Sequence, residues 1–202
     1  MKTILFLFLF LSPLVLYCSQ DEEVLNIKFM LRGYCFAASK PHKSDPGGFG
    51  ASSNQPIEFP AYYKKKSNTA ELIAYPNKHK SFFKKYKGFV LLLTNPTPKE
   101  LQFEASDSRL SIVMQAKNKE GKWVNIEYLP SSWCGNSYHT LTLPINKAWS
   151  FIVPQYTGQF KTTLRFKFKN IYSNEFKGSI NEEQFTVKKR YTPQSIMDPY
   201  LK

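Results

Sequence analysis

The sequence predicts an all-β protein whose single domain is an antiparallel β-sandwich. Short runs of alternating apolar and polar residues recur along most of the chain, as expected for strands with one buried face. Turn-forming residues separate these runs. No apolar stripe with helical spacing continues for ten residues, and a length of 202 residues suits one domain.

The clearest strand is predicted at 160–169, where two sets of side chains alternate. One set is apolar and is expected to face the core: Phe160, Leu164, Phe166 and Phe168. The other set is cationic and is expected to face water: Lys161, Arg165, Lys167 and Lys169. Period-two alternation places the two sets on opposite faces of the strand.

The remaining strands are expected to be short and to be closed by turns. In chain order they fall at 25–31, 57–63, 71–75, 89–93, 101–103, 110–116, 124–128, 141–143, 149–153, 170–176 and 184–187. Pro60 limits its strand to a sheet edge or a bulge, because proline cannot donate to the ladder. Ser, Pro, Gly and Lys dominate 37–56, which is predicted to be a long surface loop.

Two turns are expected in the second half of the chain. Residues 118–121 have the composition of a turn and should fold 110–116 back onto 124–128 as a hairpin. Gly178 is expected to mark a turn between the last two strands. The folded domain is therefore predicted to span 25–190, followed by a tail at 191–202. By analogy of architecture, the sandwich is expected to be immunoglobulin-like or fibronectin-type-III-like.

Residues 1–18 have the composition of an export signal. Lys2 precedes an apolar run of about 14 residues, which is shorter than the roughly 20 needed to span a bilayer. Cys18 follows this run, and 19–24 form an acidic polar tether. This stretch resembles a bacterial lipoprotein signal, in which the cysteine becomes the lipidated first residue. It departs from that pattern at Tyr17, where a small residue is usual.

The resemblance implies an outer-membrane or cell-surface lipoprotein, attached to the membrane only through a lipid on Cys18. The acidic run also looks like the surface-export tag of some Gram-negative lipoproteins. Ordinary cleavage near Cys18 would instead give a periplasmic or secreted protein. If Cys18 is lipidated or removed, Cys35 and Cys134 remain, and an even count in an oxidising compartment suggests a disulfide between them. The alternative is two free thiols.

Positive charge is the strongest functional signal, because the chain carries a net charge of +13. Cations and aromatic rings alternate between Tyr62 and Phe89. The candidate binding residues of this window are Lys64, Lys65, Lys66, Lys80, Lys84, Lys85, Tyr86 and Lys87. A second row consists of the four cations of 160–169. The alternative interpretation is that the rings belong to the core and the lysines extend to water.

Sequence motifs for catalysis or metal binding are weak. Cys134 and His139, with Asn136 between them, do not have the spacing of a known nucleophile and base. The three histidines are scattered, and the sequence has no paired Cys-x-x-Cys, so neither a metal nor another cofactor is predicted. No pair of carboxylates is singled out for glycoside hydrolysis.

The sequence therefore predicts an exported, non-catalytic binding module that contacts an anionic polysaccharide or an acidic protein. Nucleic acid is disfavoured as a partner because of the export signal. The alternatives are a structural or assembly subunit of a cell-envelope complex and, third, a hydrolase.

Overall fold

A computed structural model describes residues 22–129, 132 and 134–186 of the chain. The described residues form an all-β protein with two short 3-10 helices, which confirms the predicted fold class at this level. The export signal, Cys18, residues 19–21 of the tether and the C-terminal tail lie outside the described residues. Within the described part, no helix is long and apolar enough to cross a membrane.

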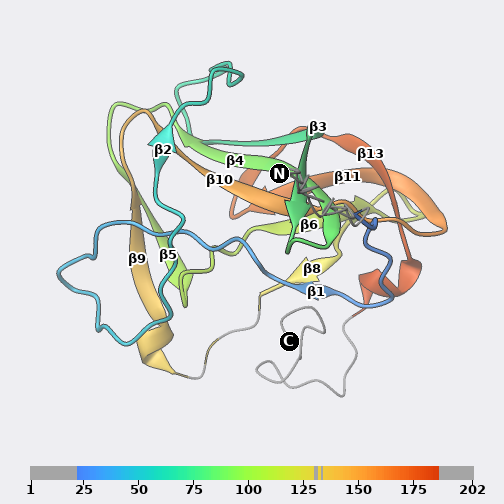
Figure 1. Ribbon diagram of the computed structural model, residues 1–202, viewed down its shortest axis with the longest axis horizontal. Helices are drawn as coiled ribbons and strands as arrows, with labels where there is room; N and C mark the ends of the chain where they lie inside the picture. Colours follow the sequence, from blue (N-terminus) through green and yellow to red (C-terminus); the bar gives the residue numbers. More distant parts are fainter. Residues whose placement is uncertain (1–21, 130–131, 133, 187–202) are drawn as a thin grey trace, which may run out of the picture.

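The strands are short, except for the hairpin formed by β3 and β4 (Figure 1). Their bounds are β1 Leu31–Arg32, β2 Ile57–Glu58, β3 Glu71–Phe82, β4 Tyr86–Asn95, β5 Leu101–Ser106, β6 Val113–Lys117, β7 Trp123–Asn125, β8 Glu127–Tyr128, β9 Tyr138–Leu143, β10 Lys147–Pro154, β11 Phe160–Phe168, β12 Ile171–Tyr172 and β13 Phe176–Ile180. The 3-10 helices are η1 Gly135–Ser137 and η2 Glu182–Phe185.

Two larger sheets make the body of the protein. The first has the strand order β2-β10-β4-β3, and the second has the order β12-β11-β6-β7, with β13 paired to the same β11. All pairs within these two sheets are antiparallel. β5 and β9 form a separate antiparallel ribbon, at the left of Figure 1, and β1 pairs with β8 in parallel.

The core lies between the two larger sheets. Phe89 of β4 contacts Phe166 of β11 and Phe176 of β13, with ring centroids 6.2 and 5.4 Å apart. Trp149 of β10 is fully buried, and its indole Nε1 donates a hydrogen bond of 2.9 Å to the carbonyl of Ala38. A buried indole needs such an acceptor, because an unpaired buried N–H is costly.

Asn174 joins the two larger sheets at one edge. Its side chain accepts a hydrogen bond from the Ala74 amide at 2.9 Å and donates one to the Ala74 carbonyl at 3.1 Å. The amide side chain thus pairs with the free edge of β3 as a neighbouring strand would. Edge groups that are paired in this way are not left exposed for aggregation.

The alternation predicted for 160–169 is confirmed in β11. Leu164, Phe166 and Phe168 are at most 3% exposed and Lys161 is exposed, but Phe160 is only partly buried and Lys169 lies beyond the end of the strand. The predicted hairpin is also present as β6 and β7, with the turn at 118–121. The loop at 37–56 contains no strand. β2 lies at a sheet edge, as Pro60 required.

Five predictions of secondary structure were wrong. The strand predicted at 57–63 ends at Glu58, and the strand predicted at 170–176 is divided between β12 and β13. Residues 25–31 make isolated bridges and only the two-residue β1, although Leu25, Ile27 and Leu31 are buried. The predicted strand at 184–187 gives way to η2, which begins with a capping box between Asn181 and Gln184. Gly178 lies inside β13 rather than at a turn. A Cβ there would lie 2.5 Å from Leu164 Cδ1, so glycine permits the close packing of β13 on β11.

Candidate binding face

The outer face of the second larger sheet gathers cations, aromatic rings and amides from several strands. Cross-strand partners in register share one face of a sheet. Arg165 of β11 is paired with Gln115 of β6, which is paired in turn with Asn125 of β7. In the same way, Lys167 lies beside Tyr172, and Lys117 lies beside Trp123. We call these residues, together with Lys161, Thr163 and Lys177, the basic face.

Arg165 is the centre of the basic face. Its guanidinium lies 4.1 Å from the ring centroid of Trp123 and 4.1 Å from that of Tyr172. The Arg165 Nε donates a hydrogen bond of 2.9 Å to Gln115 Oε1. Stacking and this hydrogen bond fix the plane of the guanidinium before any ligand arrives.

The terminal nitrogens of Arg165 have no hydrogen-bond acceptor among the described residues. A guanidinium fork matches the two oxygens of a carboxylate, sulfate or phosphate group. Gln115 Nε2 also donates to Asn125 Oδ1 at 2.8 Å, so the amides form a fixed row next to the arginine. The arrangement can therefore bind an anionic group with two parallel hydrogen bonds.

The charge of the basic face is strongly positive. Its cations are Lys117, Lys161, Arg165, Lys167 and Lys177. Glu175 lies at its edge and approaches Lys117 Nζ at 3.4 Å. Lys117 also lies 4.9 Å above the Trp123 ring, and Lys177 donates to Thr163 Oγ1 at 3.0 Å. Ion pairs at such exposed positions are weak, so these lysines remain open to an anionic partner.

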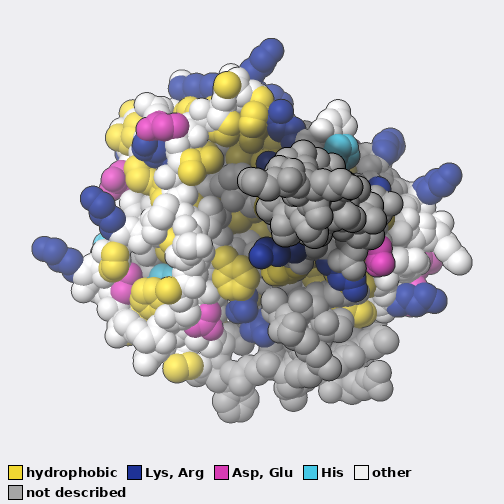
Figure 2. Space-filling model, in the orientation of Figure 1, with side chains coloured by type: hydrophobic (Ala, Val, Ile, Leu, Met, Phe, Trp, Pro, Cys, Tyr) yellow, Lys and Arg dark blue, Asp and Glu magenta, His cyan; other side chains and the backbone are white. Residues whose placement is uncertain are grey.

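The predicted binding residues lie in separate regions of the structure. Lys64, Lys65 and Lys66 precede β3, and Lys65 Nζ donates to the carbonyl of Pro96 beyond the far end of β4. The residues Lys80, Lys84, Lys85, Tyr86 and Lys87 surround the tip of the β3–β4 hairpin. At about 3.3 Å per residue, β3 separates the two groups by roughly 30 Å. Figure 2 likewise shows Lys and Arg side chains spread around the periphery of that view.

The hairpin tip and the basic face lie on different sheets. Lys85 lies 5.0 Å above the Tyr86 ring, and a hydrogen bond from Lys85 to Tyr86 raises the pKa of this lysine. Lys169, the last of the predicted row, lies at a turn after β11 and approaches Phe103 of the separate ribbon at 5.9 Å. The structure thus keeps Lys161, Arg165 and Lys167 together and leaves the other candidates elsewhere.

The sequence pattern did not indicate which aromatic side chains contact Arg165. Trp123 lies in the short strand β7, and Tyr172 lies in β12, so neither is near Arg165 in sequence. The alternation in β7 does indicate that Trp123 faces outward, because its neighbour Val124 faces inward. The contact itself depends on strand order, which a sequence pattern does not determine.

The disulfide predicted between Cys35 and Cys134 is wrong, because both thiols are free. Cys35 lies fully buried in the core, and Cys134 is exposed in front of η1. Burial raises the pKa of Cys35 well above its ordinary value, and the carboxylate of Glu127 raises it further. A buried thiol with a raised pKa is unreactive.

His139 contacts a serine rather than Cys134. Its ring stacks on Phe49, with centroids 3.6 Å apart, and its Nε2 lies 3.3 Å from Ser108 Oγ. The Ser108 hydroxyl donates a shorter hydrogen bond of 2.7 Å to the carbonyl of Gly50. Ser108 is 2% exposed, so the pair is buried and is arranged to fix the loop at 37–56 rather than to attack a substrate.

Glu127 is a buried carboxyl that the sequence did not reveal. Its Oε1 accepts hydrogen bonds from the hydroxyls of Tyr34 at 2.6 Å and Tyr156 at 2.8 Å, and its Oε2 accepts one from the Met114 amide at 2.8 Å. Burial raises the pKa of Glu127 to about 7, although these hydrogen bonds lower it in part. Among the described residues, no group of three or more His, Cys, Asp or Glu side chains could hold a metal ion.

Comparison of the chain with family models, with curated proteins and with solved structures finds no match. The function is therefore inferred from the geometry of the described residues.

Proposed function

We propose that this protein is an exported, non-catalytic binding module that holds an anionic polysaccharide on its basic face. The observation that carries the proposal is the fixed guanidinium of Arg165, held between Trp123 and Tyr172 with its terminal nitrogens directed to no described acceptor. A guanidinium held in this way loses little freedom when it binds an anion, which favours affinity.

The rest of the basic face suits a polymer better than a single ion. Alternate residues of a strand are roughly 6.7 Å apart, so Lys161, Arg165 and Lys167 form an extended row of charge along β11. Tyr172 is 46% exposed on one side of Arg165, and the Gln115–Asn125 amides lie on the other side. Rings and amides of this kind can contact sugar rings and hydroxyls, while the cations pair with uronate or sulfate groups.

The proposed location is outside the cytoplasm. The apolar run before Cys18 supports export, and the acidic residues after it support a lipid-anchored protein at the outer membrane or cell surface. An intact mass that includes a lipid on Cys18 is expected from the membrane fraction. An unmodified N-terminus at Ser19 or beyond would instead identify a periplasmic or secreted protein.

We further propose an immunoglobulin-like strand arrangement. The orders β3-β4-β10 and β7-β6-β11-β12 match the orders A-B-E and C′-C-F-G of that fold. One departure is β2, which takes the place of strand D although it precedes β3 in the chain. Cross-strand amide contacts in NMR spectra, between β4 and β10 and between β6 and β11, test this order. Different pairing would refute it.

Polysaccharide binding can be tested with heparin and alginate, each immobilised, at several salt concentrations. Arg165→Gln is expected to weaken binding about tenfold or more, and Arg165→Lys should lose most of that amount although it keeps the charge. Lys84→Gln at the hairpin tip removes one charge far from the basic face and serves as the matched control. It should weaken binding less than about twofold.

Equal losses in Arg165→Gln and Lys84→Gln, with Arg165→Lys unchanged, would show that only total charge matters and would refute the proposed site. If the protein instead co-purifies with one envelope protein in a fixed ratio and binds neither polysaccharide, it is better explained as an assembly subunit.

A further inference from the structure

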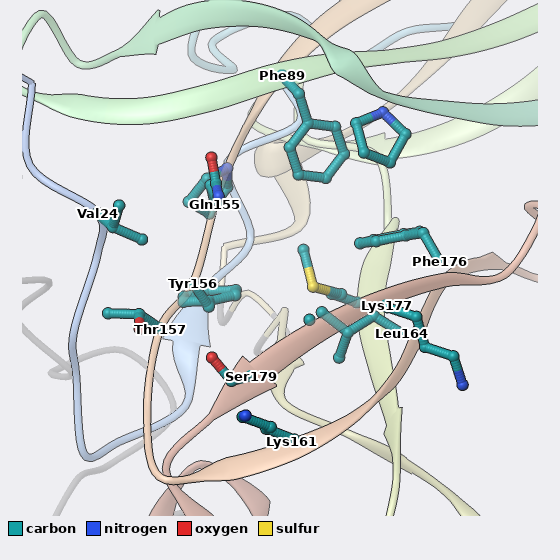
Figure 3. Close-up of a pocket in the computed structure, with 14 residues that line it drawn as sticks. Val24, Phe89, Gln155, Tyr156, Thr157, Lys161, Leu164, Phe176, Lys177 and Ser179 are labelled. Atoms are coloured by element: carbon teal, nitrogen blue, oxygen red, sulfur yellow. The ribbon is translucent and has the colours of Figure 1, made fainter.

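A pocket of about 410 Å³ opens between the two larger sheets (Figure 3). Its walls come from both sheets: Phe89 from the first, and Met114, Leu164 and Phe176 from the second. Figure 3 shows Phe89, Leu164 and Phe176 directed toward a common space. The volume lies within the range of roughly 300–1,000 Å³ that is typical of small-molecule sites.

The mouth of the pocket is polar and positive. Lys161 lines the pocket and is exposed, so it lies at the mouth, and Ser179 and Gln155 are further polar residues of the lining. The Lys161 ammonium has no hydrogen-bond or ion-pair partner among the described residues. Lys177 stands near it and is held on the outer face by Thr163.

The far side of the pocket is backed by the buried carboxyl of Glu127. Tyr156 lines the pocket and donates its hydroxyl to Glu127, and Met114 lines the pocket and donates its amide to the same group. A second carboxylate driven to that depth would meet a like charge and would lose its hydration. An anionic head group is therefore favoured only at the mouth.

We propose that this pocket binds an aliphatic carboxylate, with its acyl chain between the sheets and its head group beside Lys161. The apolar walls take the chain, and the unpaired ammonium at the mouth matches the charge of the head. The apolar interior of this site is separated from Arg165, because Leu164 and Arg165 point to opposite sides of β11, whereas Lys161 and Lys177 line the pocket and also belong to the basic face.

Isothermal titration of the purified protein with octanoate, decanoate and dodecanoate, each below its critical micelle concentration, tests the proposal. Affinity is expected to rise about fourfold for each added methylene, as for burial of apolar surface. Dodecanol and dodecylamine are the matched neutral and cationic probes. Dodecanoate should bind more tightly than dodecanol, and dodecylamine more weakly.

Four variants distinguish the head-group contact, the interior of the pocket and the basic face. Lys161→Gln should weaken dodecanoate about fivefold and leave dodecanol within about twofold. Ser179→Phe places a bulky side chain in the pocket and should abolish binding of both dodecanoate and dodecanol. Val24→Phe is a second variant of the same kind, to be used if Ser179→Phe does not fold. Arg165→Gln, which tests the basic face, should leave dodecanoate binding unchanged.

The proposal is overturned if dodecanoate shows no saturable binding, or if affinity does not depend on chain length. It is also overturned if a folded Ser179→Phe or Val24→Phe protein binds as the unmodified protein does, or if Lys161→Gln weakens the acid and the alcohol equally. Thermal melting of each variant shows that it is folded under the conditions of the titration.

Discussion

Replacing Glu127 by Gln is expected to remove much of the pH dependence of stability between about pH 4.5 and 8. Glu127 is fully buried, and its pKa is about 7 in the folded protein against an ordinary value of 4.5. Tyr34 and Tyr156 donate to one of its oxygens, and the Met114 amide donates to the other. These three donors offset only part of the cost of burying the charge.

The sign follows from proton linkage. The folded state holds the proton of Glu127 more tightly than the unfolded state, so stability is full below about pH 4.5 and is lost as the pH rises through about 7. Each unit of pKa difference corresponds to about 1.4 kcal/mol. A difference of about 2.5 units therefore amounts to roughly 3 kcal/mol, a large part of a typical stability of roughly 5–15 kcal/mol.

Glutamine can keep the same hydrogen bonds without titrating. Its carbonyl oxygen can accept from the Met114 amide, and its NH₂ group can donate to the hydroxyl oxygens of Tyr34 and Tyr156. Glu127→Gln is therefore expected to match the unmodified protein near pH 4.5 and to exceed its free energy of unfolding by up to about 3 kcal/mol at pH 8.

Urea unfolding, followed by tryptophan fluorescence at half-unit steps from pH 4.5 to 8, measures this difference. Other titrating groups cancel when the variant is subtracted from the unmodified protein. Gln102→Ala, at an exposed position of β5, changes no titrating side chain, so it serves as the control and should give a difference that does not change with pH. A constant difference for Glu127→Gln, or a measured pKa of Glu127 below 5, would refute the reasoning.

Two further predictions concern the core and the thiols. Leu164→Asp should unfold the domain, because an unpaired buried charge costs several kcal/mol. Arg165→Ser should change the free energy of unfolding by less than about 1 kcal/mol. Circular dichroism and urea unfolding measure both effects, and the reverse result would show that the two faces of β11 are assigned wrongly. Iodoacetamide, with labelled peptides located by mass spectrometry, should modify Cys134 in the native protein and Cys35 only after unfolding. A reducible Cys35–Cys134 peptide would contradict the structure.

The fold class was predictable because strand parity is a local property. From Leu164 to Phe168 of β11 the apolar and cationic side chains alternate, and the structure places them on opposite faces. The hairpin of β6 and β7 was predictable because its turn contains Gly121 in a left-handed conformation. The η2 helix was missed although its capping residues, Asn181 and Gln184, have the spacing of a capping box.

The β3–β4 hairpin illustrates what local composition cannot reveal. Its turn places Phe83 and Lys84 in the left-handed region, with φ of 49° and 57°, and contains no glycine, asparagine or aspartate as a signal. The window from Tyr62 to Phe89 was therefore treated as one patch. The hairpin instead places its lysines at two distant ends.

The burial of Glu127 could not be predicted from the sequence, because the chain bends next to it. A strand with regular alternation at 124–128 would place Val124, Ile126 and Tyr128 on one face and Glu127 on the opposite, outer face. A bend at Ile126 breaks the alternation, and both Ile126 and Glu127 are fully buried. The parallel pairing of β8 with β1 then brings Tyr34 close enough to donate to the carboxyl. That pairing joins segments far apart in sequence, so no local pattern indicates it.

β11 links the two proposed sites and also keeps them independent. Its inward Leu164 forms part of the pocket wall, and its outward Arg165 forms the centre of the basic face. A substitution at Arg165 acts on one side of the sheet, and a filling substitution at Ser179 acts on the pocket. Lys161 and Lys177 are the exceptions, because both belong to the basic face and also line the pocket. Loss of dodecanoate binding in Lys161→Gln with heparin binding largely kept, together with the opposite pattern in Arg165→Gln, would separate the two sites.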